Sequence, residues 1–550
     1  MAILLLPGRH LVNTRFQERY LSEHVQVPVD RLPLLGPKCC RGAIDEVVFA
    51  ITSANQSHSR YNPIPLEVRA IGVDRFARSL REALSIRCRI VPIPHYGPTP
   101  HFAQFLLKEI VEATEGDIVL TPENAIVLTS TPEVIDQFLA LGFGVLQGEL
   151  VSRNPLQFAA PTPIEAFKCA VAAGEGWRED AALRQAVAPA TLSVWRDFPD
   201  VLRRVVRLYR DPLLTESGSL TETRNYSTYA VGMNHQALLE VKYQDVKQAI
   251  VPGRIVDEGC ADGALLAPIA RNFPDSDLIG IEITGEFMAR CLERQRAMEY
   301  GGTYIHFHQR NISEPIFQGE SIDTTICNST THELWSYGQQ ENTLRPYLAK
   351  KYRQTRKGGR LIIRDVVGPE DREQEVLLWC NADDGRNENI HAQCASAAAL
   401  QPHLSGLSTA ARFERFAVDF LAENRATGQR GPECQLRYTT VTHDGRRFFK
   451  LRLADAMEFL LKKDYADNWA SELHEEFCFW SFTRWKQALT EVGFKVIEDP
   501  NEPAKGSRTY ASRWIVEHRF VGKAELYRVG GQRLVRLDYP VTNMVLVGQK

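Results

Sequence analysis

The stretch RIVDEGCADGALLAPIA, from Arg254 to Ala270, decides the fold of this chain. Its apolar start is typical of a buried strand that ends near Val256, and a helix is expected from about Ala264. Small residues fill the turn between them: Gly259, Cys260, Ala261 and Gly263. A turn of this kind lets a ligand approach the backbone closely at the carboxyl end of a strand.

Strand-like and helical segments continue to alternate on the carboxyl side of this turn. DLIGIEI, YIHFHQ, IDTTICN and GRLIIRDVV are short and apolar, and helical stretches separate them. Such alternation predicts an open α/β sheet. The first of these strands ends in Glu282, whose carboxylate can accept two hydrogen bonds from the hydroxyls of a ribose.

An acidic residue in the turn indicates whether the ligand is a dinucleotide or a cationic molecule. A dinucleotide-binding turn presents glycines and a helix amide end to a pyrophosphate. Here Asp257 lies two residues before the first glycine, where it would repel a pyrophosphate and attract an ammonium or sulfonium group. Residues 240–370 and the closing strands from about 494 resemble the class I S-adenosylmethionine-dependent methyltransferases in this order of features.

The resemblance implies S-adenosylmethionine as cofactor and a set of residues around it. Asn311 falls where the family often has an acceptor for the adenine amino group, and Asn328 ends the fourth strand. The implied cofactor-binding residues are Asp257, Gly259, Cys260, Ala261, Gly263, Glu282, Ile283, Asn311, Ile312 and Asn328.

The acceptor side is expected where the loops after the fourth and fifth strands converge. A base there would help remove a proton from a hydroxyl or an acidic carbon. The catalytic candidates are His332, Glu333 and Asp365, and the substrate candidates are Tyr226, Tyr229, Trp335 and Tyr337. Buried packing or helix capping explains a residue such as His332 or Asp365 equally well, and core packing explains the aromatic residues.

Residues 1–180 carry a second alternation of strands and helices. AILLLPG, DEVVFAITS, CRIVPIP and DIVLT read as buried parallel strands. The segment resembles the nicotinamide-mononucleotide adenylyltransferases through residues of a strand-end turn and the helix after it: Ser53, Ser57, His58, Asn62, Pro63, Glu67 and Arg69. Gln17 stands where that family has a phosphate-stabilising histidine, and Glu165 replaces an arginine. We expect an inactive relative that serves as scaffold or holds a nucleotide-like ligand or acceptor.

The expected architecture is therefore α/β, with two Rossmann-like open sheets and a mainly helical insertion in the second. Domain boundaries are placed at 1–215, 216–369, 370–480 and 481–550. The polar stretch DPLLTESGSLTETRNYSTYA marks the linker, the third segment is the insertion that would cover the acceptor opening, and the fourth is a helix with strands that complete the second sheet.

Composition limits the function classes. The chain has 550 residues, 44% hydrophobic and 24% charged, which excludes a wholly disordered or coiled-coil protein. A net charge of −3 disfavours nucleic acid held through bulk positive charge. No apolar run is long enough for a membrane span, and the 11 cysteines form no Cys-x-x-Cys pair, so we expect a cytoplasmic protein without a metal site. The oligomeric state stays open.

These observations favour a methyltransferase that acts on a small molecule. Two other functions remain: a bifunctional enzyme that also transfers a nucleotidyl group, and a non-catalytic regulator that binds the cofactor or a nucleotide.

Overall fold

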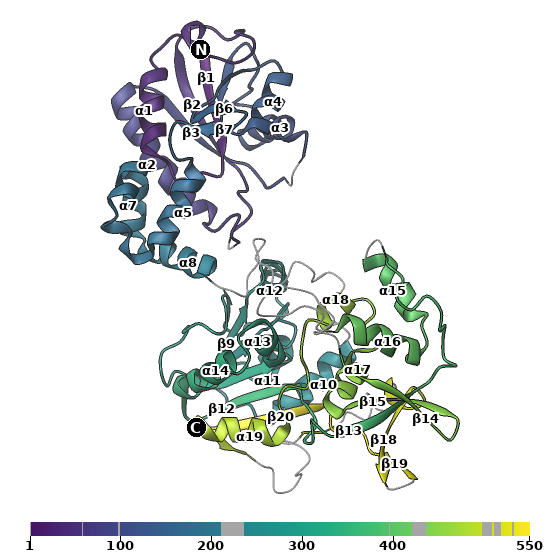
Figure 1. Cartoon of the computed structure of the whole chain (residues 1–550). Helices are drawn as coiled ribbons and strands as arrows, with labels where there is room; N and C mark the ends of the chain where they lie inside the picture. Colours follow the sequence, from purple (N-terminus) through teal and green to yellow (C-terminus); the bar gives the residue numbers. More distant parts are fainter. Residues whose placement is uncertain are drawn as a thin grey trace. The chain divides into compact units, whose positions relative to one another are not determined.

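The computed structural model describes residues 2–57, 59–96, 99–210, 236–394, 397–420, 436–497, 509–510, 519–530 and 533–550. The chain divides into two compact units, Met1–Gly218 and Ser219–Lys550 (Figure 1). The predicted linker lies outside the described residues. Within the described ranges, no helix has the length and apolar character needed to cross a bilayer.

The first unit is built on a five-stranded parallel sheet in the order β3-β2-β1-β4-β5. The strands are β1 (Ala2–Gly8), β2 (Ile44–Ile51), β3 (Arg87–Pro92), β4 (Ala125–Leu128) and β5 (Gly144–Leu146). The helices are α1 (Arg15–His24), α2 (Leu66–Leu84), α3 (Phe102–Ala113), α4 (Pro132–Ala140), α5 (Pro163–Ala173), α6 (Ala181–Ala186), α7 (Pro189–Asp197) and α8 (Pro199–Arg210). A small hairpin joins β6 (Leu150–Arg153) and β7 (Leu156–Phe158).

Alternation along the central strand explains why both faces of this sheet are covered. Leu4 and Leu6 belong to one buried cluster, whereas Ile3 and Leu5 belong to another on the opposite face. Helices must therefore pack on both sides, as expected for a buried parallel sheet.

One predicted strand of this unit is wrong. DIVLT, residues 117–121, is not a strand, and β1 pairs instead with the segment after it, Ile3 opposite Ala125. Ile118 and Leu120 are buried and gave the segment its strand-like pattern, but Val119 is 53% exposed.

The second unit contains an eight-stranded sheet whose main path is β10-β9-β8-β11-β12-β20-β16, with β17 also paired to β20. The first five strands are parallel to one another, and β20 is antiparallel to β12. The strands are β8 (Arg254–Glu258), β9 (Asp277–Glu282), β10 (Ile305–Gln309), β11 (Ile322–Asn328), β12 (Thr355–Val366), β16 (Lys495–Val496), β17 (Thr509–Tyr510) and β20 (Asn543–Gln549). The order reverses between β8 and β11, so a ligand crevice is expected beyond the carboxyl ends of those strands.

Helices connect these strands. They are α10 (Gln236–Lys247), α11 (Leu266–Asn272), α12 (Gly285–Arg296), α13 (Thr331–Tyr337), α14 (Glu341–Gln354) and α19 (Phe482–Glu491). Neighbouring strand residues again enter two different buried clusters, with Val256 on one face and Ile255 on the other. The strand prediction for residues 254–366 is confirmed by this sheet.

The insertion differs from the mainly helical segment that we expected. It contributes β13 (Glu375–Cys380), β14 (Thr439–His443) and β15 (Arg446–Arg452) to a separate antiparallel sheet, β14-β15-β13-β18-β19. The other two strands are β18 (Ala524–Gly530) and β19 (Arg533–Leu537), which we had assigned to completion of the main sheet. Among the described residues of the closing segment, only β16, β17 and β20 join the main sheet.

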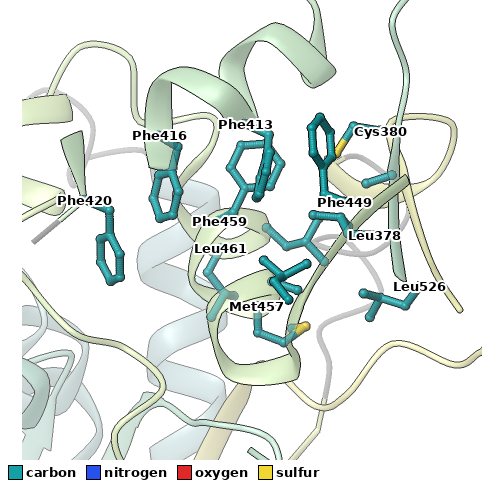
Figure 2. Close-up of a cluster of buried hydrophobic side chains, with 14 of the residues drawn as sticks. Leu378, Cys380, Phe413, Phe416, Phe420, Phe449, Met457, Phe459, Leu461 and Leu526 are labelled. Carbon is teal, nitrogen blue, oxygen red and sulfur yellow. The ribbon is translucent and has the colours of Figure 1, made fainter. Parts of the chain in front are cut away.

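A buried aromatic cluster explains this arrangement (Figure 2). The helices α15 (Ala397–Ser405), α16 (Thr409–Asp419), α17 (Leu453–Lys462) and α18 (Trp469–Glu472) belong to the same region. Phe413 of α16 packs against Phe449 of β15 and Phe459 of α17, with ring centroids 4.2 and 5.2 Å apart. Leu526 of β18 is buried in the same cluster. Because β18 contributes to this core, the insertion and the first part of the closing segment share one antiparallel sheet and one hydrophobic core.

Candidate active site

The turn after β8 has the backbone shape that small residues permit. Gly259 and Gly263 have φ angles of +72° and +76°, and Ala261 reaches +48°. A Cβ at Gly259 would lie 2.5 Å from the Oγ1 of Thr330, so only glycine fits there. The helix α11 begins at Leu266, two residues later than we expected.

Glu282 fastens this turn to the next strand. Its Oε2 accepts from the Ala261 amide at 3.0 Å, and its Oε1 accepts from the amides of Ile283 and Thr284, both at 2.9 Å. Burial, together with the nearby Glu333, raises the pKa of Glu282 to about 7. A carboxylate offers about four acceptor positions, so three internal bonds leave roughly one for a ligand hydroxyl.

Among the residues of this turn, Asp257 gives the clearest sign of a ligand-binding role. Its side chain is 2% exposed, and its Oδ2 has no hydrogen-bond partner among the described residues. Burial raises the pKa of Asp257 to about 7, although Lys242 counteracts part of this shift. A buried carboxylate oxygen without a partner is costly unless a donor or cation completes it. The residues of this turn therefore fit a small cationic group.

Lys242 of α10 was missed by the sequence analysis. Burial lowers the pKa of its ammonium to about 8, while Asp257, Asp262 and Asp365 act in the opposite direction. The sequence feature that could have identified Lys242 is its position on the helix immediately before β8. Nothing in the local pattern indicated that this helix would bring a lysine to the carboxyl ends of the strands.

The neighbouring Glu258 points to the other face of the sheet. It is fully buried, forms an ion pair with Lys351 and accepts from the Tyr347 hydroxyl at 2.7 Å. Adjacent residues of a strand alternate between faces, so two consecutive acids serve two purposes. Glu258 anchors α14, whereas Asp257 faces the region of Lys242.

The loop after β10 holds the expected adenine-binding residues. Asn311 Oδ1 accepts from the amide and the hydroxyl of Ser313, at 2.8 and 2.7 Å. Lys350 of α14 donates to the carbonyls of Ile312 and Glu314, which fixes the path of the loop. Burial lowers the pKa of Lys350 to about 7.

Two further cofactor-binding candidates, Cys260 and Asn328, bond to neighbouring residues of the chain. The Cys260 amide donates to the Ile281 carbonyl at 3.1 Å, and its thiol is buried beside Cys291, which raises the thiol pKa. Asn328 is half-buried at the end of β11, where its Oδ1 accepts from the Ser329 hydroxyl at 3.3 Å.

His332 and Asp365 form a buried ion pair. Asp365 Oδ1 lies 2.6 Å from His332 Nδ1, and the Nε2 of the same ring lies 3.4 Å from Glu475 Oε2. Burial alone would lower the pKa of His332, but the two carboxylates outweigh it and raise this pKa well above its usual value. The imidazole is therefore a cation held between two acids, a different arrangement from a base that awaits a substrate proton.

Asp365 also caps the helix that carries His332. Its Oδ2 accepts from the amides of Thr331 and His332 at 2.7 and 3.2 Å, and from the Thr331 hydroxyl. The Val366 amide donates to its Oδ1. These bonds and His332 lower the pKa of Asp365 despite its burial. A carboxylate with this many donors positions α13 through side-chain capping across the sheet.

The predicted substrate residues on α13 hold the insertion in place. The Trp335 indole donates to Glu476 at 2.9 Å, and the Tyr337 hydroxyl donates to Glu475 at 3.0 Å. The Glu476 amide donates in return to Ser336. One side of α13 therefore docks the insertion's last segment onto the main sheet. Glu333, half-buried on the same helix, lies near Glu282 instead.

The two substrate tyrosines Tyr226 and Tyr229 lie outside the described residues. Tyr243, the next tyrosine along the chain, is buried in the core between α10 and the sheet. It is a packing residue.

In the first unit, the motif residues serve local structure. Arg69 is buried and donates to the carbonyls of Arg9, Thr52 and Ser53, at 2.8 to 3.0 Å. Gln17 and Glu165 each close a capping box at the start of their own helix. His58 lies outside the described residues.

Solved structures of methyltransferases are similar to parts of this chain. Solved structures similar to this chain include an S-adenosylmethionine-dependent methyltransferase from Thermotoga maritima (14% identity, TM-score 0.28, 59% of this chain and 95% of that one). They also include a Haemonchus contortus phosphoethanolamine N-methyltransferase in complex with S-adenosylhomocysteine (16% identity, TM-score 0.21, 24% and 29%). With TM-scores of 0.28 and 0.21, these likenesses do not establish a shared fold.

No curated protein sequence matches the chain. A family model described as a methyltransferase domain matches residues 252–417, which begin just before β8 and end in α16. The match includes the turn with Asp257, the strand end with Glu282 and the capped helix α13. The second unit of this chain therefore contains a methyltransferase domain.

Proposed function

We propose that the second unit transfers a methyl group from S-adenosylmethionine to a small-molecule acceptor. The observation that carries this proposal is Asp257 Oδ2, a buried carboxylate oxygen without a partner at the switch point of the sheet. When bound, the cofactor would supply a methyl group on its sulfonium sulfur, and the neutral thioether S-adenosylhomocysteine would be the leaving group.

The residues of the chain then have separate tasks. Asp257 accepts from the ammonium of the cofactor, and Glu282 accepts from a ribose hydroxyl with its remaining acceptor position. The loop that contains Asn311 and Ile312 borders the adenine, and Lys350 holds this loop through two carbonyls. All of these groups orient the donor so that an acceptor atom can reach it in line.

The acceptor approaches from the side of β11 and β12. Glu333, half-buried on α13 after β11, remains the base candidate on this side. His332 and Asp365 become positioning residues, since both ring nitrogens and both carboxylate oxygens have partners. The insertion, docked through Trp335 and Tyr337, excludes water from the opening.

For the first unit we propose a relative of nucleotidyltransferases without catalytic activity. The Gln17 amide is neutral and the Glu165 carboxylate is acidic, so neither offers a cation to a phosphate. Both side chains instead cap the helices that they begin. We infer a cytoplasmic protein, and a nucleotide-like ligand or an acceptor held by the first unit is compatible with this proposal.

The test is methyl transfer from methyl-labelled S-adenosylmethionine to a cell metabolite extract, followed by mass spectrometry with the full-length protein. Labelled products that disappear with Asp257→Asn are expected. Cofactor binding without any labelled product would favour a regulator. Magnesium-dependent pyrophosphate release from ATP would favour a bifunctional enzyme.

A further inference from the structure

The first unit contains a cavity of about 580 Å³, and the motif residues Gln17 and Glu165 are among those that line it. It lies beyond the carboxyl ends of β1 and β4, where the strand order of the sheet reverses. Residues from β1, α1, the loop after β4 and the start of α5 line it. Its apolar and aromatic surface comes from Leu11, Phe16, Tyr20, Leu128, Phe158 and Ile164.

One polar group in this wall lacks a partner. Glu149 is 4% exposed, and its Oε1 makes no hydrogen bond with any described residue. Its Oε2 accepts from the Ser130 hydroxyl, whose oxygen accepts in turn from the Glu149 amide at 3.0 Å. Burial raises the pKa of Glu149, while hydrogen bonds from the Ser130 hydroxyl, from its own amide and from the Gln17 side chain lower it. These bonds hold the carboxylate in place, and its Oε1 has no partner among the described residues.

The helix ends around the cavity are already satisfied. At the start of α5, the Glu165 carboxylate accepts from the Thr162 amide at 2.8 Å, and the Thr162 hydroxyl accepts from the Glu165 amide. Thr14 and Gln17 do the same at the start of α1. A phosphate at the start of α5 would meet the Glu165 carboxylate, although Lys168 of the same helix and Arg9 also line the cavity. The unused group is an acceptor, and it requires a donor.

We propose that this cavity binds a small molecule with an amino or amidino group, whose N–H donates to Glu149 Oε1 while its apolar part lies against Phe16 and Tyr20. A charge-assisted hydrogen bond to a buried carboxylate is strong and selects a cation over an anion of the same shape. This site belongs to the first unit and is independent of the methyl-transfer proposal.

The experiment is calorimetric titration of the full-length protein with matched probes: benzamidine and tryptamine as cations, benzoate and indole-3-propionate as anions, and ATP with magnesium. The expected result is binding of at least one cationic probe with a dissociation constant below about 1 mM, and at least tenfold weaker binding of its anionic counterpart.

Two substitutions test whether the Glu149 carboxylate causes the preference for cationic probes. Glu149→Gln should weaken the cationic probe about tenfold or more, whereas Glu165→Gln, on the same wall but with its carboxylate used for capping, should leave the affinity within about twofold. Circular dichroism and the thermal unfolding transition of the first unit report whether each variant is folded. If Glu149→Gln does not fold, the comparison of cation with anion in the unchanged protein decides.

Three results would overturn the proposal: no cationic probe binds at about 5 mM, an anionic probe or ATP binds more tightly than both cations, or Glu149→Gln binds as well as the original chain. Tighter binding of ATP would indicate that this cavity is a nucleotide-binding site.

Discussion

Asp257 should make the binding of S-adenosylmethionine depend on pH. In the cofactor-free structure its pKa is about 7, because burial penalises the charged form. Only the ionised carboxylate attracts the cation strongly. About a tenth of a group with this pKa is ionised at pH 6 and about nine-tenths at pH 8, so the apparent affinity should rise roughly tenfold over this range, or about 1.4 kcal/mol.

Glu282 shares this behaviour, since its pKa is also about 7. In the unfolded chain both carboxyls titrate near 4. Between roughly pH 4 and 7 the folded, cofactor-free protein therefore binds more protons than the unfolded chain, and its stability should fall as the pH rises through this window. Cofactor binding should reverse that loss, because a cation favours the ionised form.

The assay is calorimetry at pH 6, 7 and 8, repeated in two buffers of different ionisation enthalpy so that proton release is counted. Asp257→Asn serves as the control: it should bind more weakly at pH 8 and show a flatter pH profile. Equal dissociation constants at pH 6 and 8 would refute the reasoning. So would an unchanged slope in Asp257→Asn.

The remaining predictions concern single contacts. Glu282→Ala removes three backbone partners and a ribose acceptor, so cofactor affinity should fall tenfold or more by calorimetry; unchanged affinity in a folded variant would exclude Glu282 from the site. His332→Ala breaks a buried ion pair and should lower the stability of the second unit by about 3–5 kcal/mol in denaturant unfolding; a smaller effect on stability with a large loss of rate would restore a catalytic role. Phe413→Ala leaves a void in the insertion core and should cost about 3–5 kcal/mol, and retained methyl transfer at full rate would argue against the insertion as a cover. The full-length chain with nicotinamide mononucleotide, ATP and magnesium should release no pyrophosphate, and detectable adenylylation would show that the first unit is an active enzyme.

The sequence alone determined the main sheets because their signals are local. An apolar strand, a turn of small residues and a helix follow one another within the segment from Arg254 to Ala270, and the structure places the strand, turn and helix there in that order. The position of Asp257 two residues before Gly259 likewise required no knowledge of distant contacts. A carboxylate at the end of a parallel strand reaches the ligand crevice by topology alone.

Only the tertiary structure decided what the distant side chains do. Asp365 and His332 were each candidates for a catalytic base, yet α13 brings His332 between Asp365 and Glu475, a residue 143 positions further along the chain than His332. In the same way, β18 pairs with β13 rather than with the main sheet, because Leu526 completes a core supplied by the insertion. Strand pairing and ion pairing depend on which surfaces pack together in the folded chain. The local hydrophobic pattern of a segment predicts which of its faces is buried, but it does not identify the segment that packs against that face.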